Sequence, residues 1–367
     1  MTLLLALVLG CAEAPAPGAP ASPAAPAPEA APAPAREPET VVVVASTSPT
    51  EGLAPLRLGW QTTWATQGQL VAVLLHTDIL ARNGFAGELR GYPYGAPLNE
   101  GALAGQVDVV FTADQPALAL AAKDPSWGII GRLVYNRVGT VVPLASGAET
   151  PRDLARKTLA VPFGAAAQRE AMEAIQAEGL DPTRDVKLVD RSAEEILGFV
   201  RAGARDGRWG DIDAAAVFDP TFAEIERSKR ARTIASSVVT GVVMMDDDYL
   251  AAHPGADVRF RTALAEAWDV YRADPPRADR WFQQMAKLRF DVAALTAAAA
   301  VEPNLTAATS ADIRVHLVPD DVAELRAAGT FLAKNDLLPA EVAPEKVVRP
   351  IATVPVAPVD TSKVAIR

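Results

Sequence analysis

The stretch LRLGWQTTWATQGQLVAVLLHTDILARNGFAGELRG, residues 56–91, predicts a strand, a helix and a second strand in succession. Residues 56–60 and 87–91 are the strands, and residues 69–82 carry apolar side chains at the three-to-four spacing of an amphipathic helix. Strands that alternate with helices of this length are typical of a parallel sheet covered by helices on both faces. We therefore expect an α/β fold.

The same alternation continues along the chain and then starts again. The predicted segments are helix 98–104, strand 107–111, helix 115–122, strand 139–143, a short capped helix at 150–154, strand 158–162, helix 166–177, strand 185–189, a helix opened by a capping box at Ser192, strand 212–218, a helix to about 227 and an apolar strand at 238–245. Residues 246–335 are predicted to be almost all helical.

Two similar halves predict two lobes, each a mostly parallel sheet flanked by helices. The chain is expected to cross from lobe 1 to lobe 2 near residues 141–143 and to return near 242–245. The two crossover strands would form a hinge, with a cleft between the carboxyl ends of the two sheets, where ligands of open α/β sheets bind.

Composition separates the two ends of the chain from this globular part. The predicted organisation is a signal peptide with a lipobox at 1–11, an Ala/Pro-rich linker at 12–54, the first part of lobe 1 at 55–142, lobe 2 at 143–241, the helical return to lobe 1 at 242–340 and an extended C-terminal tail at 341–367. Repeated proline favours extended polyproline II, so the linker is expected to be a semi-rigid spacer.

The apolar run at residues 1–10 ends in Gly10 and Cys11. It is too short to span a bilayer, which needs about 20 residues, and it resembles a bacterial lipoprotein signal, in which the cysteine takes the lipid. Cys11 is the only cysteine, so no intramolecular disulfide can form. No Lys or Arg precedes the run, so an apolar start with an incidental cysteine is the alternative. We expect lipid anchoring through Cys11 on the periplasmic side of the cell envelope.

Charge and hydrophobicity narrow the function classes. Half of the residues are hydrophobic, so a sizeable core can be buried. The formal net charge of -10 argues against nucleic acid or an anionic membrane as the main partner, because both attract basic faces.

Four segments carry a resemblance to a known family. They are GWQT at 59–62, GALAGQVDVV at 101–110, TPRDL at 150–154 followed by KTLAVPF at 157–163, and GDIDA at 210–214. In this order and spacing they resemble the NMT1/THI5-like periplasmic binding proteins of ABC transporters, which take taurine, alkanesulfonates, nitrate and thiamine-precursor pyrimidines. The resemblance covers about residues 56–338. It implies a type II periplasmic-binding-protein fold and a monomeric receptor that delivers a small solute to an ABC permease.

The resemblance also implies that loops at strand ends hold the ligand. Four such loops map to residues 61–64, 112–115, 163–166 and 218–220, and each is expected to open a helix and to present free backbone N–H groups. The expected ligand-binding residues are Gln61, Thr62, Thr63, Trp64, Thr112, Asp114, Gln115, Phe163, Gly164, Ala165, Phe218 and Asp219. For Thr62, Thr63 and Thr112, helix capping and ligand contact are both open.

The residue types in these loops suggest the ligand's chemistry. Asp114 and Asp219 would place carboxylates in the cleft, which attract a cation or a hydrogen-bond donor, whereas Arg137 and Arg169 could offset them. Aromatic residues gather at the same loops, namely Trp60 or Trp64, Tyr92 or Tyr94, Phe111, Phe163 and Phe218, although Phe111 and Phe218 could instead belong to the core. We therefore expect an amine or a nitrogen heterocycle, ahead of a sulfonate-type solute.

Other chemistry finds little support in the sequence. The three histidines, His76, His253 and His316, have no HxxxH spacing, and no motif for a nucleophilic serine, a P-loop or a dinucleotide is present. We expect no catalytic residues, no metal and no cofactor. Two alternatives remain: an accessory lipoprotein that senses a solute, and an enzyme that uses the two cleft carboxylates.

Overall fold

The computed structural model describes residues 42–45, 52–287, 289–350 and residue 365. The chain divides into two units, Met1–Pro38 and Glu39–Arg367, and all described residues belong to the second unit. The expected signal peptide, Cys11 and residues 12–41 of the expected linker lie outside the described residues.

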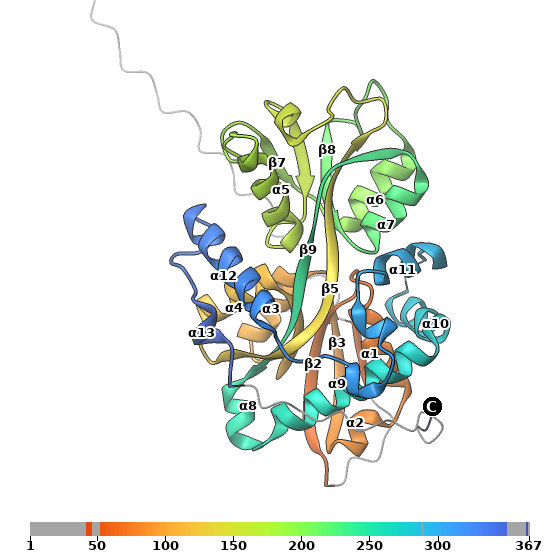
Figure 1. Cartoon of the computed structure of the whole chain (residues 1–367), viewed down its shortest axis with the longest axis vertical. Helices are drawn as coiled ribbons and strands as arrows, with labels where there is room; N and C mark the ends of the chain where they lie inside the picture. The colour runs from red at the N-terminus through yellow and green to blue at the C-terminus, as the bar shows by residue number, and fades with distance from the viewer. Residues whose placement is uncertain (1–41, 46–51, 288, 351–364, 366–367) are drawn as a thin grey trace, which may run out of the picture. The chain divides into compact units, whose positions relative to one another are not determined.

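One mixed sheet of nine described strands runs through the second unit in the order β1-β3-β2-β4-β9-β5-β8-β6-β7 (Figure 1). The strands are β1 Val42–Ala45, β2 Ala54–Gln61, β3 Phe85–Tyr92, β4 Val109–Ala113, β5 Trp127–Pro143, β6 Thr158–Val161, β7 Lys187–Asp190, β8 Ala214–Phe218 and β9 Ala231–Asp246. Every residue of β4 and β8 is buried, as expected for strands covered on both faces.

The sheet has two mostly parallel halves, as the sequence predicts. On one side β2 pairs in parallel with β3 and β4, and on the other β6 pairs in parallel with β7 and β8. In the middle β5 and β9 run antiparallel to each other, to β8 and to β4. We call the half with β1–β4 lobe 1 and the half with β6–β8 lobe 2.

The two crossover strands are much longer than the sequence predicts. β5 has 17 residues and β9 has 16, and they run side by side through both lobes (Figure 1). Polar residues such as Arg132 and Asn136 interrupt the apolar pattern of β5, so the sequence predicts only its last five residues as a strand. β5 already pairs with β8 at Val138, ahead of the crossing expected at 141–143. Because both strands are continuous, the expected lobe boundaries at 142 and 241 stay predictions.

Helices cover both parts of the sheet. They are α1 Gln67–His76, α2 Ile79–Arg82, α3 Gly95–Leu103, α4 Asp114–Lys123, α5 Ala166–Ala177, α6 Ala193–Ala202, α7 Thr221–Ser228, α8 Asp247–Ala252, α9 Ala256–Ala273, α10 Pro275–Ala286, α11 Val292–Ala299, α12 Pro319–Lys334 and α13 Pro344–Val347, with 3-10 turns η1 Pro151–Leu154, η2 Pro303–Thr306 and η3 Ser310–Asp312. Helices α5–α7 belong to lobe 2 (Figure 1). In the described part of the chain, no helix combines the length and the apolar character that a membrane crossing requires.

Local capping explains several helix starts. Ser192 and Glu195 form the expected capping box of α6, with Ser192 Oγ accepting from the Glu195 N–H at 3.2 Å. Asp246 caps α8 by accepting from the Asp248 N–H at 3.2 Å. The acidic run that begins at Asp246 therefore serves a helix start, and the described residues contain no cluster of metal-ligating side chains.

Both ends of the globular part are more structured than the sequence predicts. The expected linker contains β1, which pairs antiparallel with β3 at the edge of the sheet. The expected extended tail begins with α13, and after it Val348 forms a β-bridge with Ile129. Arg349 then donates to Asp247 at 2.6 Å. These two corrections follow from β-branched residues that find an open strand edge or core surface in the folded lobe.

Candidate functional site

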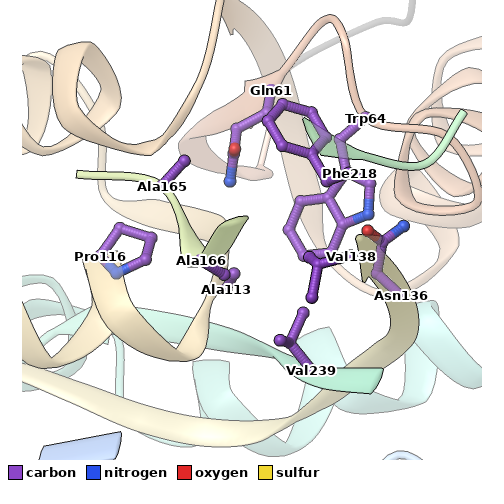
Figure 2. Close-up of a pocket in the computed structure, with 10 residues that line it drawn as sticks. All are labelled: Gln61, Trp64, Ala113, Pro116, Asn136, Val138, Ala165, Ala166, Phe218 and Val239. Carbon is purple, nitrogen blue, oxygen red and sulfur yellow. The ribbon is translucent and has the colours of Figure 1, made fainter. Parts of the chain in front are cut away.

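A small cavity lies at the crossing of the two lobes, with a free volume of about 10 Å³. This is room for roughly one water molecule, so the lobes are closed against each other. Ten residues line it (Figure 2): Gln61, Trp64, Ala113, Pro116, Asn136, Val138, Ala165, Ala166, Phe218 and Val239.

The topology brings these residues together because parallel strands in each lobe end at the same edge. Gln61, Ala113 and Phe218 are the last residues of β2, β4 and β8, and Ala165 precedes α5. The hinge strands contribute Asn136, which is paired with Val239 across β5 and β9. The cavity therefore contains residues of lobe 1, lobe 2 and the hinge, as a cleft at the carboxyl ends of the strands requires.

Two hydrogen-bond donors at the cavity have no partner among the described residues. They are Nε1 of Trp64, whose side chain is 3 % exposed, and Nδ2 of Asn136, which is 1 % exposed. In the view of Figure 2, both side chains lie on the side of the cavity opposite Pro116. A buried donor without an acceptor costs about 1–3 kcal/mol. The cavity wall therefore favours a ligand that brings hydrogen-bond acceptors.

The expected cleft carboxylates do not line the cavity. Asp114, fully buried at the start of α4, accepts from Nη2 of Arg169 in α5 at 2.5 Å and from the Gln115 N–H at 2.6 Å. Asp219 accepts from Nε of Arg137 at 2.8 Å and from Nη2 at 3.1 Å. These ion pairs agree with the alternative in which Arg137 and Arg169 offset the two carboxylates, whereas ligand contact by Asp114 and Asp219 stays a prediction.

Burial raises the pKa of two carboxylates that accept hydrogen bonds from residues of the hinge strand β5. It raises the pKa of Asp219 to about 6, although the hydrogen bonds from Arg137 favour the charged form. Glu170, the neighbour of Arg169 in α5, is 4 % exposed and accepts from the Thr140 hydroxyl at 3.0 Å. Burial raises its pKa to about 7.

The three candidate threonines neither cap a helix nor line the cavity. Thr62 donates to the Tyr92 carbonyl at 3.3 Å and Thr63 to the Pro93 carbonyl at 2.6 Å, so both hold their loop to the end of β3. Thr112 is buried within β4, and its hydroxyl has no partner among the described residues.

The loop before α5 lies where the lobes approach closely. Gly164 has φ +77°, and a Cβ there would lie 3.1 Å from Cβ of Ala96 in α3 of lobe 1. Its N–H donates to Oε1 of Gln168 at 2.8 Å, and the same oxygen accepts from Gln115 of lobe 1 at 3.5 Å. Phe163 is 39 % exposed and does not line the cavity. Glycine at 164 thus allows close contact between the lobes.

Packing distinguishes the tryptophan and phenylalanine alternatives, whereas neither Tyr92 nor Tyr94 lines the cavity. Trp64 lines the cavity, whereas Trp60 is fully buried in the core. Phe111 also belongs to the core, where its ring centroid lies 5.9 Å from that of Phe260. Phe218 lines the cavity (Figure 2).

The hinge residues of the cavity were missed by the sequence analysis. Asn136 and Val138 lie in the part of β5 that does not read as strand, and Val239 begins the apolar half of β9. One signal was present: Asn136 is an amide within a largely apolar run, and such a residue buried in a sheet commonly serves a polar contact.

No family model matches the sequence, and no curated protein matches it. Solved structures do match. The alkanesulfonate-binding protein SsuA from Xanthomonas axonopodis pv. citri, bound to MOPS, is 20% identical with a TM-score of 0.65, covering 81% of this chain and 98% of its own. The periplasmic aliphatic sulphonate-binding protein SsuA from Escherichia coli is 16% identical with a TM-score of 0.64, covering 84% and 94%.

An enzyme also shares the fold. The desulfurization enzyme DszB is 16% identical with a TM-score of 0.54, covering 80% of this chain and 96% of its own. At these identities the comparisons concern the fold, which serves solute binding in most of these proteins and catalysis in DszB. The chain therefore has the two-lobed α/β fold found in periplasmic solute-binding proteins of the SsuA type.

Proposed function

We propose that the protein is the solute-binding receptor of an ABC importer. The main support for this proposal is the small cavity between two lobes that share a two-strand hinge, whose wall contains the buried unpartnered donors of Trp64 and Asn136. Hinge opening would widen this cavity, which has room for about one water molecule in the present structure, and closure onto a solute would bury the solute against both lobes. Similar folds serve periplasmic sulfonate-binding proteins.

The proposed contact residues combine sequence-based candidates with a hinge residue. Gln61, Trp64, Ala165 and Phe218 were expected, and Asn136 joins them. Of the ten side chains that line the cavity, none is titratable. This favours a receptor over an enzyme, because acid/base catalysis needs a titratable group within reach of the ligand.

The solute we propose is small and carries hydrogen-bond acceptors, as a sulfonate-type anion does. The donors at the cavity are the Trp64 indole N–H and the Asn136 amide. No described side chain caps α5, so its first-turn N–H groups add a positive dipole end next to Ala165. This reverses our sequence-based preference for an amine, which rested on carboxylates that the structure pairs with arginines.

We further propose that the receptor is tethered to the periplasmic side of a membrane through a lipid on Cys11. The apolar run before Cys11 and the Ala/Pro-rich segment after it support this proposal. A membrane permease would then take the solute from the closed receptor.

The test combines native mass spectrometry of the freshly purified protein with thermal melts in MOPS, ethanesulfonate and, as the amine control, ethanolamine. We expect the sulfonates to raise the melting temperature, since a ligand at 100 times its Kd adds about 2.7 kcal/mol of stability. If ethanolamine raised it and both sulfonates failed, the proposed ligand chemistry would be wrong.

A matched pair of variants locates the binding site. Trp64 and Trp209 are both 3 % exposed and both have an unpartnered indole N–H, but only Trp64 lines the cavity. We expect Trp64→Phe to weaken sulfonate binding roughly 10-fold or more, the worth of one hydrogen bond to a charged group. Trp209→Phe should leave binding unchanged. An equal loss of sulfonate binding in both variants would show that the cavity is not the binding site.

A further inference from the structure

One buried ion pair joins the two lobes directly. Asp114 is the first residue of α4 in lobe 1, and Arg169 lies in the first turn of α5 in lobe 2. Nη2 of Arg169 donates to Oδ2 of Asp114 at 2.5 Å, with side chains 5 % and 1 % exposed. Both charges have therefore left solvent at a contact between lobes.

The pair lies beside the cavity. Ala113 and Pro116, on either side of Asp114 in the sequence, line the cavity, as do Ala165 and Ala166, one helical turn before Arg169. Residues three or four apart lie on the same helix face, so Arg169 faces lobe 1 together with these alanines.

The other contacts of Arg169 show that Asp114 is its link to lobe 1. Arg169 is also held within its own helix by Glu173, whose carboxylate accepts from Nη1 at 2.8 and 2.9 Å. Nε of Arg169 is buried and has no partner among the described residues. The contact with Asp114 is thus the arginine's only ion pair across the lobes among the described residues.

Charge burial makes such a contact sensitive to the hinge. In the closed protein both charges of the pair have left water. Removal of Arg169 would leave the Asp114 carboxylate buried without a counter-charge among the described residues, whereas removal of Asp114 would leave Arg169 paired with Glu173 alone. Opening of the hinge would rehydrate the remaining charge, so the cost of the lost partner would favour the open state.

We propose that Asp114 and Arg169 are positioning residues that act as an interlobe latch: they set the balance between open and closed receptor, and through it the affinity for solute. Neither residue lines the cavity, so the pair acts on solute through closure. The effect on the hinge needs no solute, and only the effect on affinity rests on the proposed function.

The experiment measures the distance between the lobes in solution. Leu103 in lobe 1 and Leu144 at the start of lobe 2 are 40 % and 54 % exposed, so Leu103→Cys and Leu144→Cys can carry spin labels once Cys11, the only native cysteine, is changed to Ser. Pulsed electron spin resonance then reports the distribution of distances in the ligand-free protein.

The latch variants are Arg169→Gln, Asp114→Asn and the double variant. We expect each single variant to lower the ratio of closed to open molecules, Arg169→Gln at least 10-fold, because it leaves the Asp114 carboxylate buried on closure. The double variant, which removes both charges, should recover much of the closed population. An unchanged distance distribution in Arg169→Gln would overturn the proposal.

The matched control is an ion pair that lies within one helix. Nη2 of Arg272 donates to Oδ1 of Asp269 at 2.7 Å within α9, and the Asp269 side chain is 1 % exposed, as the Asp114 side chain is. Arg272→Gln should lower the melting temperature without changing the distance distribution. If Arg272→Gln opened the protein as much as Arg169→Gln, the loss of stability would explain both results and the latch would be rejected.

A second readout keeps the test decisive if Arg169→Gln does not fold. Arg169→Lys keeps the positive charge but loses the planar fork, and it should shift the distance distribution in the same direction by a smaller amount. With MOPS as the probe, Kd should rise by the same factor as the closed fraction falls. A shift in distances with no MOPS binding to any variant would retain the latch and reject the proposed solute.

Discussion

Two buried aspartates, each paired with an arginine, lie next in sequence to cavity residues Ala113 and Phe218, and the two pairs differ in what they connect. Asp114–Arg169 joins helix starts of different lobes, whereas Asp219–Arg137 joins the end of β8 to the hinge strand β5, its neighbour in the sheet. Asp219 also accepts from the Ala223 N–H at 2.9 Å and so caps the first turn of α7. The same chemistry therefore serves closure in one place and the internal structure of lobe 2 in the other.

The largest effect is expected when Asp219 loses its arginine. Arg137→Gln removes the partner of a carboxylate whose pKa burial already raises to about 6. We expect a loss of about 2 kcal/mol in unfolding free energy at pH 8 and little loss at pH 4.5, where Asp219 can take up a proton. Urea denaturation at the two pH values measures this.

The sign follows from the direction of the shift. A carboxylate with a raised folded-state pKa contributes stability that is complete below its unfolded value, about 4, and is lost as pH rises through about 6. Without Arg137 this loss should grow and move to higher pH. The interlobe distance should not change. If Arg137→Gln increased this distance as Arg169→Gln does, the two pairs would not differ in their effect on closure.

Glu170 provides a contrast with Asp114 and Asp219, because it is a buried carboxylate that forms no ion pair with a described residue. Its pKa is raised from 4.5 to about 7, so its stability contribution is lost as pH rises between these values. Glu170→Gln cannot ionise and its side-chain oxygen can still accept from Thr140. We expect a gain of about 1–3 kcal/mol at pH 8 and almost none at pH 4.5. Equal melting curves of variant and parent at pH 8 would contradict this.

The smallest effect is expected at the exposed contact between lobes. Arg227 of α7 pairs with Asp291, the N-cap of α11, at 3.3 Å, with side chains 44 % and 55 % exposed. Exposed pairs contribute little because water and salt screen them. Arg227→Gln should therefore leave both the melting temperature and the interlobe distance unchanged. A clear increase in the interlobe distance of this variant would show that the exposed contact also stabilises the closed state, in addition to the Asp114–Arg169 pair.

Local signals in the sequence predicted much of the fold. The bounds of α5 at 166–177 and the capping box of Ser192 agree with the structure, because both depend on residues close together in the chain. The predicted end of β8 at Phe218 also agrees with the structure, whereas β4 ends at Ala113, two residues later than predicted.

The partners of Asp114 and Asp219 could not be predicted in the same way. Arg169 is 55 positions from Asp114, and Asp219 is 82 positions from Arg137, so only the folded topology brings them together. Both arginines were visible in the sequence but could not be placed, and the ligand charge that we propose therefore differs from the sequence-based expectation. Asn136 was missed for a related reason: a strand that serves two lobes has no single apolar pattern along its length.

The paired strands β5 and β9 also restrict how the protein can move. A continuous antiparallel ribbon resists stretching and sliding, because either would break its ladder of hydrogen bonds, but it bends and twists more readily. The ladder has register shifts at Ile129/Gly131, Arg132/Tyr135 and Thr140/Val141, and irregularities of this kind are where a ribbon bends. The Arg132/Tyr135 shift lies between the part of β5 beside β4-paired β9 and the part paired with β8, which begins at Val138. Motion between the lobes should therefore be mainly a rotation about this part of the ribbon, with little sliding of one lobe past the other.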